Sequence, residues 1–143
     1  MPKVLISDKL SPAAVEIFRN RGIDVDIKTG LSPADLRAII GAYDGLAIRS
    51  ATKVTKELLE VATNLKVVGR AGIGVDNVDV RSATARGVVV MNTPLGNTIT
   101  TAEHAVAMMF ALARQLPEAS ASTKLGRWEK NRFMGVELTA KTL

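Results

Sequence analysis

Residues Leu65–Gly74 read LKVVGRAGIG, and this stretch decides the fold. It starts as a short run of apolar, partly β-branched residues, Leu65–Gly69, and passes through Arg70 into a glycine-rich turn. Runs of the same kind recur about 20 residues apart on both sides of it, at Val4–Ser7, Val25–Lys28, Leu46–Arg49 and Val88–Met91. Short runs at this spacing predict five β-strands with helices between them.

The segments between the strands carry helix start and stop signals. Pro12 and Pro33 each follow a serine, which is the order of an N-cap and a first helical residue. By their cap residues, the predicted helices run from Ser11 to Gly22, from Ser32 to Gly41, from Thr55 through Asn64, and from Asp76 or Asn77 to near Gly87. Strands alternating with helices form right-handed parallel β-α-β units. Residues 1 to 92 are therefore predicted to form an α/β, flavodoxin-like parallel five-stranded sheet with helices on both faces.

The pattern changes at Thr100. Thr100 and Glu103 have the spacing of a capping box, which predicts a helix over residues 101–116. This helix is apolar on nearly all sides, so we expect it to be buried against a second domain or a second subunit. Pro117 should end or kink it, and an irregular arm is expected over residues 120–136. The chain stops at Leu143 without a closing helix, as expected of a fragment.

Composition excludes several classes of function. The 143 residues are 47% hydrophobic and 23% charged, as in a soluble globular protein. There is no cysteine and one histidine, His104, which excludes disulfides, multi-histidine metal sites and cysteine nucleophiles. No signal peptide or membrane span is evident, so we expect a cytoplasmic protein without a membrane partner. Five Lys or Arg against two Glu in residues 120–143 indicate a solvated arm rather than a nucleic-acid surface.

Candidate binding residues follow the strands, because ligands of parallel sheets bind outside the carboxyl ends of the strands. Arg49 and Arg70 offer forked donors, and the turn Gly72–Gly74 can aim backbone amides at an oxyanion. Asn97 follows the last strand by a few residues. Together they predict a site for a small anionic ligand. Alternatively, the arginines pair with Asp44, Asp76 or Asp79, and the glycines serve the turn alone.

Three other functions fit the motifs poorly. The run Gly72–Asn77 has asparagine where a dinucleotide fingerprint has its third glycine, and no acidic residue ends the next strand. A phosphoacceptor receiver needs an aspartate after the third strand, where Arg49 stands. His104 has no evident partner for catalysis, so we expect it to pack or to cap the helix.

In these motifs the sequence resembles the D-isomer-specific 2-hydroxyacid dehydrogenase family, in its branch acting on 3-phosphoglycerate. The matching segments cover the chain in order: Ile48–Thr55 (IRSATKVT), Val67–Val80 (VVGRAGIGVDNVDV), Met91–Pro94 (MNTP), Leu112–Pro117 (LARQLP) and Trp128–Leu143 (WEKNRFMGVELTAKTL). The resemblance implies a substrate-binding domain over residues 1–98. Residues 99–143 would be a crossover and dimerisation helix with an arm, at the start of a nucleotide-binding domain whose remainder is absent.

The resemblance also implies roles for individual residues. The implied substrate-binding residues are Arg49, Ser50, Arg70, Gly72, Asn97 and Lys130, and Ile73 is the implied contact to the cofactor NAD. Ile73 replaces a threonine of other members, which leaves only its backbone for that contact. Lys130 would reach toward the site of the partner subunit in a homo-oligomer formed through helix 100–116 and arm 120–136. No catalytic residue and no metal ligand is expected in this chain.

The implied parent reaction is the NAD-dependent oxidation of 3-phosphoglycerate to 3-phosphohydroxypyruvate, at the entry to serine biosynthesis. Because the family's main dinucleotide motif and its catalytic arginine, glutamate and histidine lie downstream, this chain alone is expected to be inactive. Two alternatives stay open: another D-2-hydroxyacid dehydrogenase, acting on glyoxylate or lactate for example, and a stand-alone anion-binding or oligomerisation module.

Overall fold

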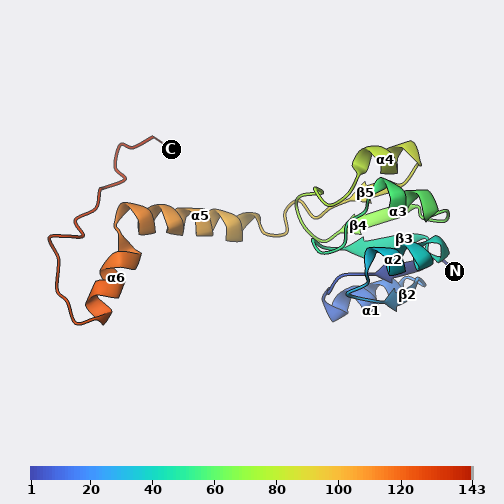
Figure 1. Cartoon of the computed structure of the whole chain (residues 1–143), viewed down its shortest axis with the longest axis horizontal. Helices are drawn as coiled ribbons and strands as arrows, with labels where there is room; N and C mark the ends of the chain where they lie inside the picture. Colours follow the sequence, from blue (N-terminus) through green and yellow to red (C-terminus); the bar gives the residue numbers. More distant parts are fainter. Residues whose placement is uncertain (143) are drawn as a thin grey trace. The chain divides into compact units, whose positions relative to one another are not determined.

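The computed structural model describes residues 1–142 of the protein (Figure 1). Within them the strands are β1 (Lys3–Ile6), β2 (Asp24–Ile27), β3 (Gly45–Ile48), β4 (Val67–Arg70) and β5 (Val89–Met91). The helices are α1 (Pro12–Asn20), α2 (Pro33–Ile39), α3 (Lys56–Val61), α4 (Val80–Ala85), α5 (Thr98–Ala113) and α6 (Leu116–Lys124), with a 3-10 turn, η1, at Ile40–Ala42. The chain forms two compact units, Met1–Gly96 and the residues from Asn97 onward.

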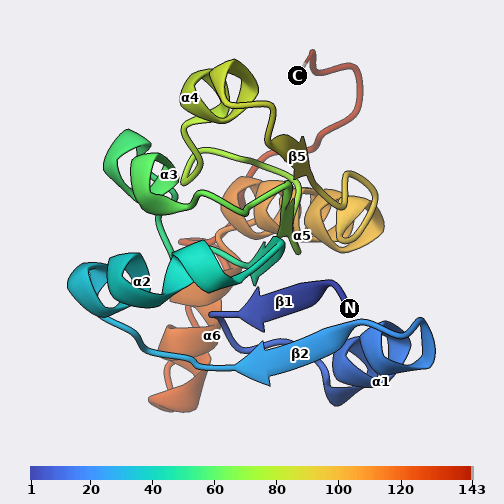
Figure 2. The same ribbon diagram turned by 90° about the vertical axis from the view of Figure 1, so that its right-hand side faces the viewer.

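The first unit is a parallel sheet in the order β2-β1-β3-β4-β5. Figure 1 shows β2, β3, β4 and β5 following one another across the first unit, and in Figure 2 the arrowheads of β1 and β2 point the same way. This order is that of flavodoxin-like folds, so the predicted fold class is confirmed. All five predicted strands form, each within one or two residues of its expected bounds.

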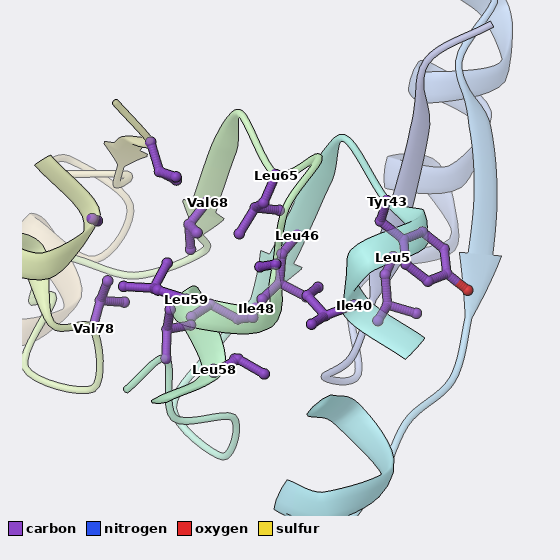
Figure 3. Close-up of a cluster of buried hydrophobic side chains, with 14 of the residues drawn as sticks. Leu5, Ile40, Tyr43, Leu46, Ile48, Leu58, Leu59, Leu65, Val68 and Val78 are labelled. Atoms are coloured by element: carbon purple, nitrogen blue, oxygen red, sulfur yellow. The ribbon is translucent and has the colours of Figure 1, made fainter. Parts of the chain in front are cut away.

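Helices cover both faces of the sheet, and the alternation of side chains along the strands divides the core between them. Leu5, Leu46 and Val68 face one side, where α2, α3 and α4 supply Leu36, Leu59 and Ala83. Figure 3 shows this cluster, in which side chains from the strands meet those from the helices. On the other face α1 packs with Val15 and Phe18 against Val4, Ile6 and Ala47.

Two helices of the first unit differ from their predicted bounds. The fourth begins after Asp79, whose carboxylate accepts from the Ser82 amide at 2.9 Å, and not at Asp76 or Asn77. The reason is an isolated parallel bridge: residues on both sides of Val78 exchange backbone hydrogen bonds of 2.8 Å with Val54. A segment held extended in this way cannot start a helix. The third helix ends at Val61 and not at Asn64, whose side-chain amide donates to the Gly41 carbonyl at 2.7 Å.

In the second unit, the predicted capping box is wrong. Helix α5 begins at Thr98 after Asn97, so Thr100 lies inside the helix, and α5 ends at Ala113 rather than at 116. Gln115 then adopts a left-handed conformation (φ 52°), and α6 occupies part of the segment predicted to be irregular. No side chain of α5 is buried within the described residues.

The arm after α6 is anchored to its own unit by specific contacts. Glu129 accepts hydrogen bonds from the buried Ser122 hydroxyl, at 2.7 Å, and from Arg132, at 3.3 Å. The Val136 amide donates to the Ala113 carbonyl at 2.8 Å. Gly135 makes this approach possible, since a β-carbon there would clash with the same carbonyl oxygen. Part of the arm is therefore attached to the end of α5 rather than fully solvated.

Replacing Leu59 by alanine tests the core described above. Leu59 has no exposed surface, so Leu59→Ala should lower the free energy of unfolding by roughly 2–5 kcal/mol through lost burial and a residual cavity. Urea denaturation followed by circular dichroism measures this change. The matched control is Leu95→Ala: Leu95 is 83% exposed, so we expect a change within about 0.5 kcal/mol. Equal losses in both variants would contradict this assignment of the core.

Candidate functional site

The strand register places the predicted polar residues at one edge of the sheet. Ile48 of β3 pairs with Arg70 of β4, and the Ala71 amide donates to the Ile48 carbonyl at 2.8 Å. The chain therefore leaves β3 and β4 at the same level, with Arg49 beginning one loop and Ala71 the other. Asp8 follows β1 and Asn92 follows β5 at this edge.

The loop after β3 is held from one side by Asp8. This carboxylate is 7% exposed and accepts from the backbone amides of Arg49, at 2.7 Å, and Thr52, at 3.1 Å. The Thr52 hydroxyl donates to it at 2.7 Å and lies 2.8 Å from the Ser7 hydroxyl. Nothing in the sequence shows that Asp8 reaches a loop 41 residues away, so this role could not be predicted from the sequence.

These donors set the protonation of Asp8. Burial is the largest single influence and by itself would raise the pKa of the carboxyl. Together, the hydrogen bonds from the Thr52 hydroxyl and from the amides of Thr52, Arg49 and Ala51 outweigh burial and hold the pKa below its ordinary value of 3.8. Asp8 is thus a carboxylate at neutral pH, and its charge faces the loop it organises.

Asn77 holds the same loop through its carbonyl groups. Its side-chain nitrogen donates to the Arg49 carbonyl at 2.7 Å and to the Thr52 carbonyl at 2.6 Å. Asn77 occupies the position where a dinucleotide fingerprint has its third glycine, and its side chain holds the loop through these two hydrogen bonds. With both backbone groups of Arg49 fixed, its exposed side chain projects from an ordered base, with exposed Ser50 beside it.

In the glycine turn after β4, the carbonyl groups of Gly72, Ile73 and Gly74 accept hydrogen bonds from other residues of the chain. The Gly72 carbonyl accepts from the Thr93 amide at 2.9 Å, the Ile73 carbonyl from the Asn92 side chain at 2.7 Å, and the Gly74 carbonyl from the Arg70 guanidinium. Within residues 1–142 the amides of Ile73 and Gly74 have no acceptor, and both residues are exposed. Two unpaired N–H groups are thus open to a ligand oxygen.

Arg70 and Arg49 are not equivalent. The Arg70 side chain is 12% exposed, contacts Asp76 at 3.6 Å, and lies where a β-carbon on Gly72 would come within 2.8 Å of it. Gly72 thus makes room for the guanidinium. The predicted alternative of pairing with Asp76 is confirmed for Arg70. Arg49 has no ion pair in the part of the chain that the structure describes.

The remaining predicted residues belong to the second unit. Asn97 precedes α5, and its carbonyl accepts from the Thr101 amide at 2.9 Å. Lys130 is exposed in the arm. His104 is exposed on α5, so the expectation that it packs or caps the helix is wrong. Like the other side chains of α5, it is not buried within residues 1–142.

Two further features of residues 1–142 bear on the choice of chemistry. No group of three or more His, Cys, Asp or Glu side chains is arranged to hold a metal ion. Among the helices described, none has the length and apolar character needed to cross a membrane. The groups available at the sheet edge are therefore an exposed guanidinium, open amides and hydroxyls, which suit an anion.

Comparison with known proteins identifies the family to which this chain belongs. Residues 4–140 match the model of the D-isomer specific 2-hydroxyacid dehydrogenase catalytic domain. D-3-phosphoglycerate dehydrogenase of Archaeoglobus fulgidus is 49% identical over 140 residues, which are 98% of this chain and 27% of the relative. This chain thus spans about a quarter of the length of the curated relatives it matches.

Two solved structures illustrate the likeness in fold. The PH0520 protein of Pyrococcus horikoshii OT3 superposes with a TM-score of 0.84 at 32% identity, covering 96% of this chain and 42% of that one. The NAD⁺-bound 3-phosphoglycerate dehydrogenase of Entamoeba histolytica superposes with a TM-score of 0.69 at 28% identity, covering 79% and 39%.

Replacing Asp8 tests the loop geometry. Asp8→Asn puts an amide against three donors, so at pH 7 it should lower the free energy of unfolding by roughly 1–3 kcal/mol. Because the folded pKa is depressed, the contribution of the charge is present above about pH 4 and disappears as pH falls through the folded pKa. The difference from wild type, measured by urea denaturation, should therefore shrink below pH 4. Hydrogen exchange at the Arg49 and Thr52 amides should also accelerate.

The matched control for this substitution is Glu16→Gln on α1, which removes the charge of an exposed carboxylate. We expect it to change neither the stability nor the exchange of the loop amides. A loss in Asp8→Asn that stays constant from pH 7 to pH 2, with unchanged exchange, would show that the Asp8 carboxylate does not hold the loop.

Proposed function

Because the chain belongs to the D-isomer specific 2-hydroxyacid dehydrogenase family, we propose that it is the substrate-domain portion of an NAD-dependent oxidoreductase acting on 3-phosphoglycerate. The proposed reaction of the whole protein is oxidation to 3-phosphohydroxypyruvate, which would serve serine biosynthesis. Residues 1–98 are the proposed substrate-binding domain, and residues 99–143 are the proposed start of the nucleotide-binding domain. The relatives carrying the name D-3-phosphoglycerate dehydrogenase favour this substrate over other 2-hydroxy acids.

One observation carries the proposal: an exposed, unpaired arginine stands on an immobilised loop beside open backbone amides. Arg49 supplies a full positive charge and a forked donor pair, which match a phosphate or a carboxylate. The amides of Ile73 and Gly74 can bind a second oxyanion without charge. 3-Phosphoglycerate carries two such anionic groups, one at each end of a three-carbon chain, and so needs two separate anion-binding elements.

The other proposed contacts follow from the same geometry. Ser50, next to Arg49, adds a hydroxyl donor, and Gly72 is a proposed backbone contact in the turn beside it. Arg70 acts mainly by bracing this turn, with its remaining charge raising the local positive potential. Asn97 and Lys130 are proposed substrate contacts from the second unit, Lys130 acting in the site of a partner subunit.

The glycine turn does not fit the pyrophosphate of a dinucleotide. The space at Gly72 is taken by the Arg70 guanidinium, and the space at Gly74 by the Asp76 carboxylate. A side-chain amide, that of Asn77, fills the position of the third glycine. We therefore assign to this chain only a backbone contact from Ile73 to the nicotinamide end of the cofactor. When bound, NAD supplies the hydride acceptor for oxidation of the substrate hydroxyl.

The residues of this chain bind and orient the substrate but do not move its proton. His104, the one histidine, is exposed on α5 and has no hydrogen-bond partner within the described residues. The family resemblance places the base that accepts the hydroxyl proton outside this chain, and we propose that residues 1–143 alone are inactive.

A thermal-shift experiment on this chain tests the proposed substrate. A ligand that binds only the folded state stabilises it, by roughly 2.7 kcal/mol at a hundredfold excess over Kd. 3-Phosphoglycerate should raise Tm, and D-glycerate, which lacks the phosphate, should do so much less. Arg49→Ala should reduce the affinity by about 10- to 150-fold, as expected for the loss of roughly 1.5–3 kcal/mol from a charge-assisted hydrogen bond.

The matched control is Arg19→Ala, which removes an exposed arginine from α1. This variant should respond to 3-phosphoglycerate as the wild type does. A shift produced by NAD and absent with 3-phosphoglycerate would overturn the assignment of the glycine turn. A response to 3-phosphoglycerate that Arg49→Ala leaves intact would overturn the assignment of the anion site.

The apolar surface of the second unit supports the proposed homo-oligomer. Met108, Phe110 and Leu112 of α5 are 58, 49 and 83% exposed, and Leu116 continues the apolar surface. Two of them, Met108 and Leu112, line a hollow of about 550 Å³ together with Phe133 of the arm. Contiguous apolar surface of this kind marks protein interfaces. We propose that two copies of the chain associate through α5 and the arm.

Replacing Leu112 by glutamate tests the association. A charge in an apolar interface costs several kcal/mol unless it is paired, so Leu112→Glu should convert the protein to a monomer. Sedimentation equilibrium at two concentrations measures the change. Ile17→Glu, on the 57% exposed Ile17 of α1, is the matched control and should leave the wild-type oligomer intact. A wild-type chain that stays monomeric at the higher concentration would refute the proposed interface.

A further inference from the structure

A second cavity lies in the first unit, apart from the candidate anion site. It measures about 430 Å³ and lies among the ends of β1 and β2, the start of α2, the loop after β3 and the start of α3. None of Arg49, Ser50, Arg70, Gly72 and Ile73 lines it. Its volume is in the range of cavities that hold small organic ligands, about 300–1,000 Å³.

The wall of this cavity is mainly apolar. Leu31, Leu36, Ala51 and Leu58 line it, and of these Leu36 and Leu58 also belong to the buried core, where they are 5% and 3% exposed. Their surfaces facing the cavity are supported by the core behind them, so the wall is preformed. An apolar body of a few ring or branched-chain atoms fits such a wall better than a sugar or a polyphosphate does.

The charged groups around the cavity favour an anion. Arg37 of α2 and Lys53 of the loop both line it, both are exposed, and neither has an ion pair within residues 1–142. Asp8 also lines it, but both of its oxygens accept hydrogen bonds from Arg49 and Thr52 and are directed to the loop. The cavity is therefore lined by two cations that have no ion pair and by one carboxylate whose oxygens already accept hydrogen bonds from the loop.

We propose that this cavity binds a small monoanionic molecule with an apolar body, such as an aromatic or branched-chain carboxylate. The apolar body lies against Leu31, Leu36 and Leu58, and the carboxylate is held at the rim by Arg37 and Lys53. This site is independent of the proposed function, since it shares none of the substrate-binding residues. Both sites nevertheless adjoin the loop after β3, so a bound molecule lies against Ala51–Lys53, two residues from Arg49.

A pair of probes that differ only in charge tests this proposal. The ¹⁵N-labelled chain is titrated with indole-3-acetate and, separately, with the neutral indole-3-acetamide. Indole-3-acetate should shift the amide resonances of Leu36, Arg37 and residues 51–55, and indole-3-acetamide should bind at least tenfold more weakly. The double variant Arg37→Ala/Lys53→Ala should lose the preference for the carboxylate.

Two further variants make the result decisive. Ala51→Trp puts a large side chain at the cavity wall from an exposed position, so it should abolish binding while the chain stays folded. Arg19→Ala/Lys28→Ala removes two exposed cations that do not line the cavity and should bind indole-3-acetate as the wild type does.

The proposal is overturned if neither probe shifts these resonances, if both bind equally well, or if the shifts fall on α5 instead. Thermal shift with 3-phosphoglycerate is measured on the same variants. A variant that loses the indole-3-acetate response while keeping the 3-phosphoglycerate response separates this site from the anion site. Arg49→Ala should show the opposite pattern: it should lose the 3-phosphoglycerate response and keep the indole-3-acetate response.

Discussion

Where the chain leaves a sheet at its carboxyl edge, the backbone N–H and C=O groups lose their hydrogen bonds to the neighbouring strand. Each of these groups that is buried needs another hydrogen-bond partner. For the loop after β3, Asp8 accepts the amides of Arg49 and Thr52, and Asn77 donates to their carbonyl groups. Four backbone groups of one short loop are thus satisfied by two side chains from other parts of the chain. The position of Arg49, and with it the proposed anion site, depends on this arrangement.

The two arginines show how one residue type serves two purposes at one edge. Arg70 is largely buried against the turn it braces, and Gly72 leaves the space for its guanidinium. Arg70 holds the Gly74 carbonyl, and Thr93 and Asn92 hold those of Gly72 and Ile73, while the amides of Ile73 and Gly74 have no acceptor within residues 1–142. Arg49 supplies the exposed charge. In the proposed site, Arg49 therefore supplies the charge that binds the ligand, while Arg70 holds the turn whose amides face it.

The second unit follows a different logic. Its long helix buries no side chain within residues 1–142, although its sequence is apolar on nearly every side. The local contacts of Glu129 and Gly135 attach the arm to this unit without covering the helix. Such a surface is stable in solution only when something covers it, which is the physical reason for proposing a second copy of the chain there.

The amino-acid sequence by itself determined the five strands, their parallel order and the edge at which polar residues gather, because the apolar runs and their spacing are local properties. It also carried the family resemblance in the residues around Arg49 and Arg70. It misplaced the fourth helix, since the bridge between Val54 and Val78 that delays its start joins distant segments. For the same reason it missed the roles of Asp8 and Asn77, whose partners lie 25 to 44 residues away. Only the tertiary structure brings such pairs within hydrogen-bonding distance, and only those distances distinguish the bracing arginine from the exposed one.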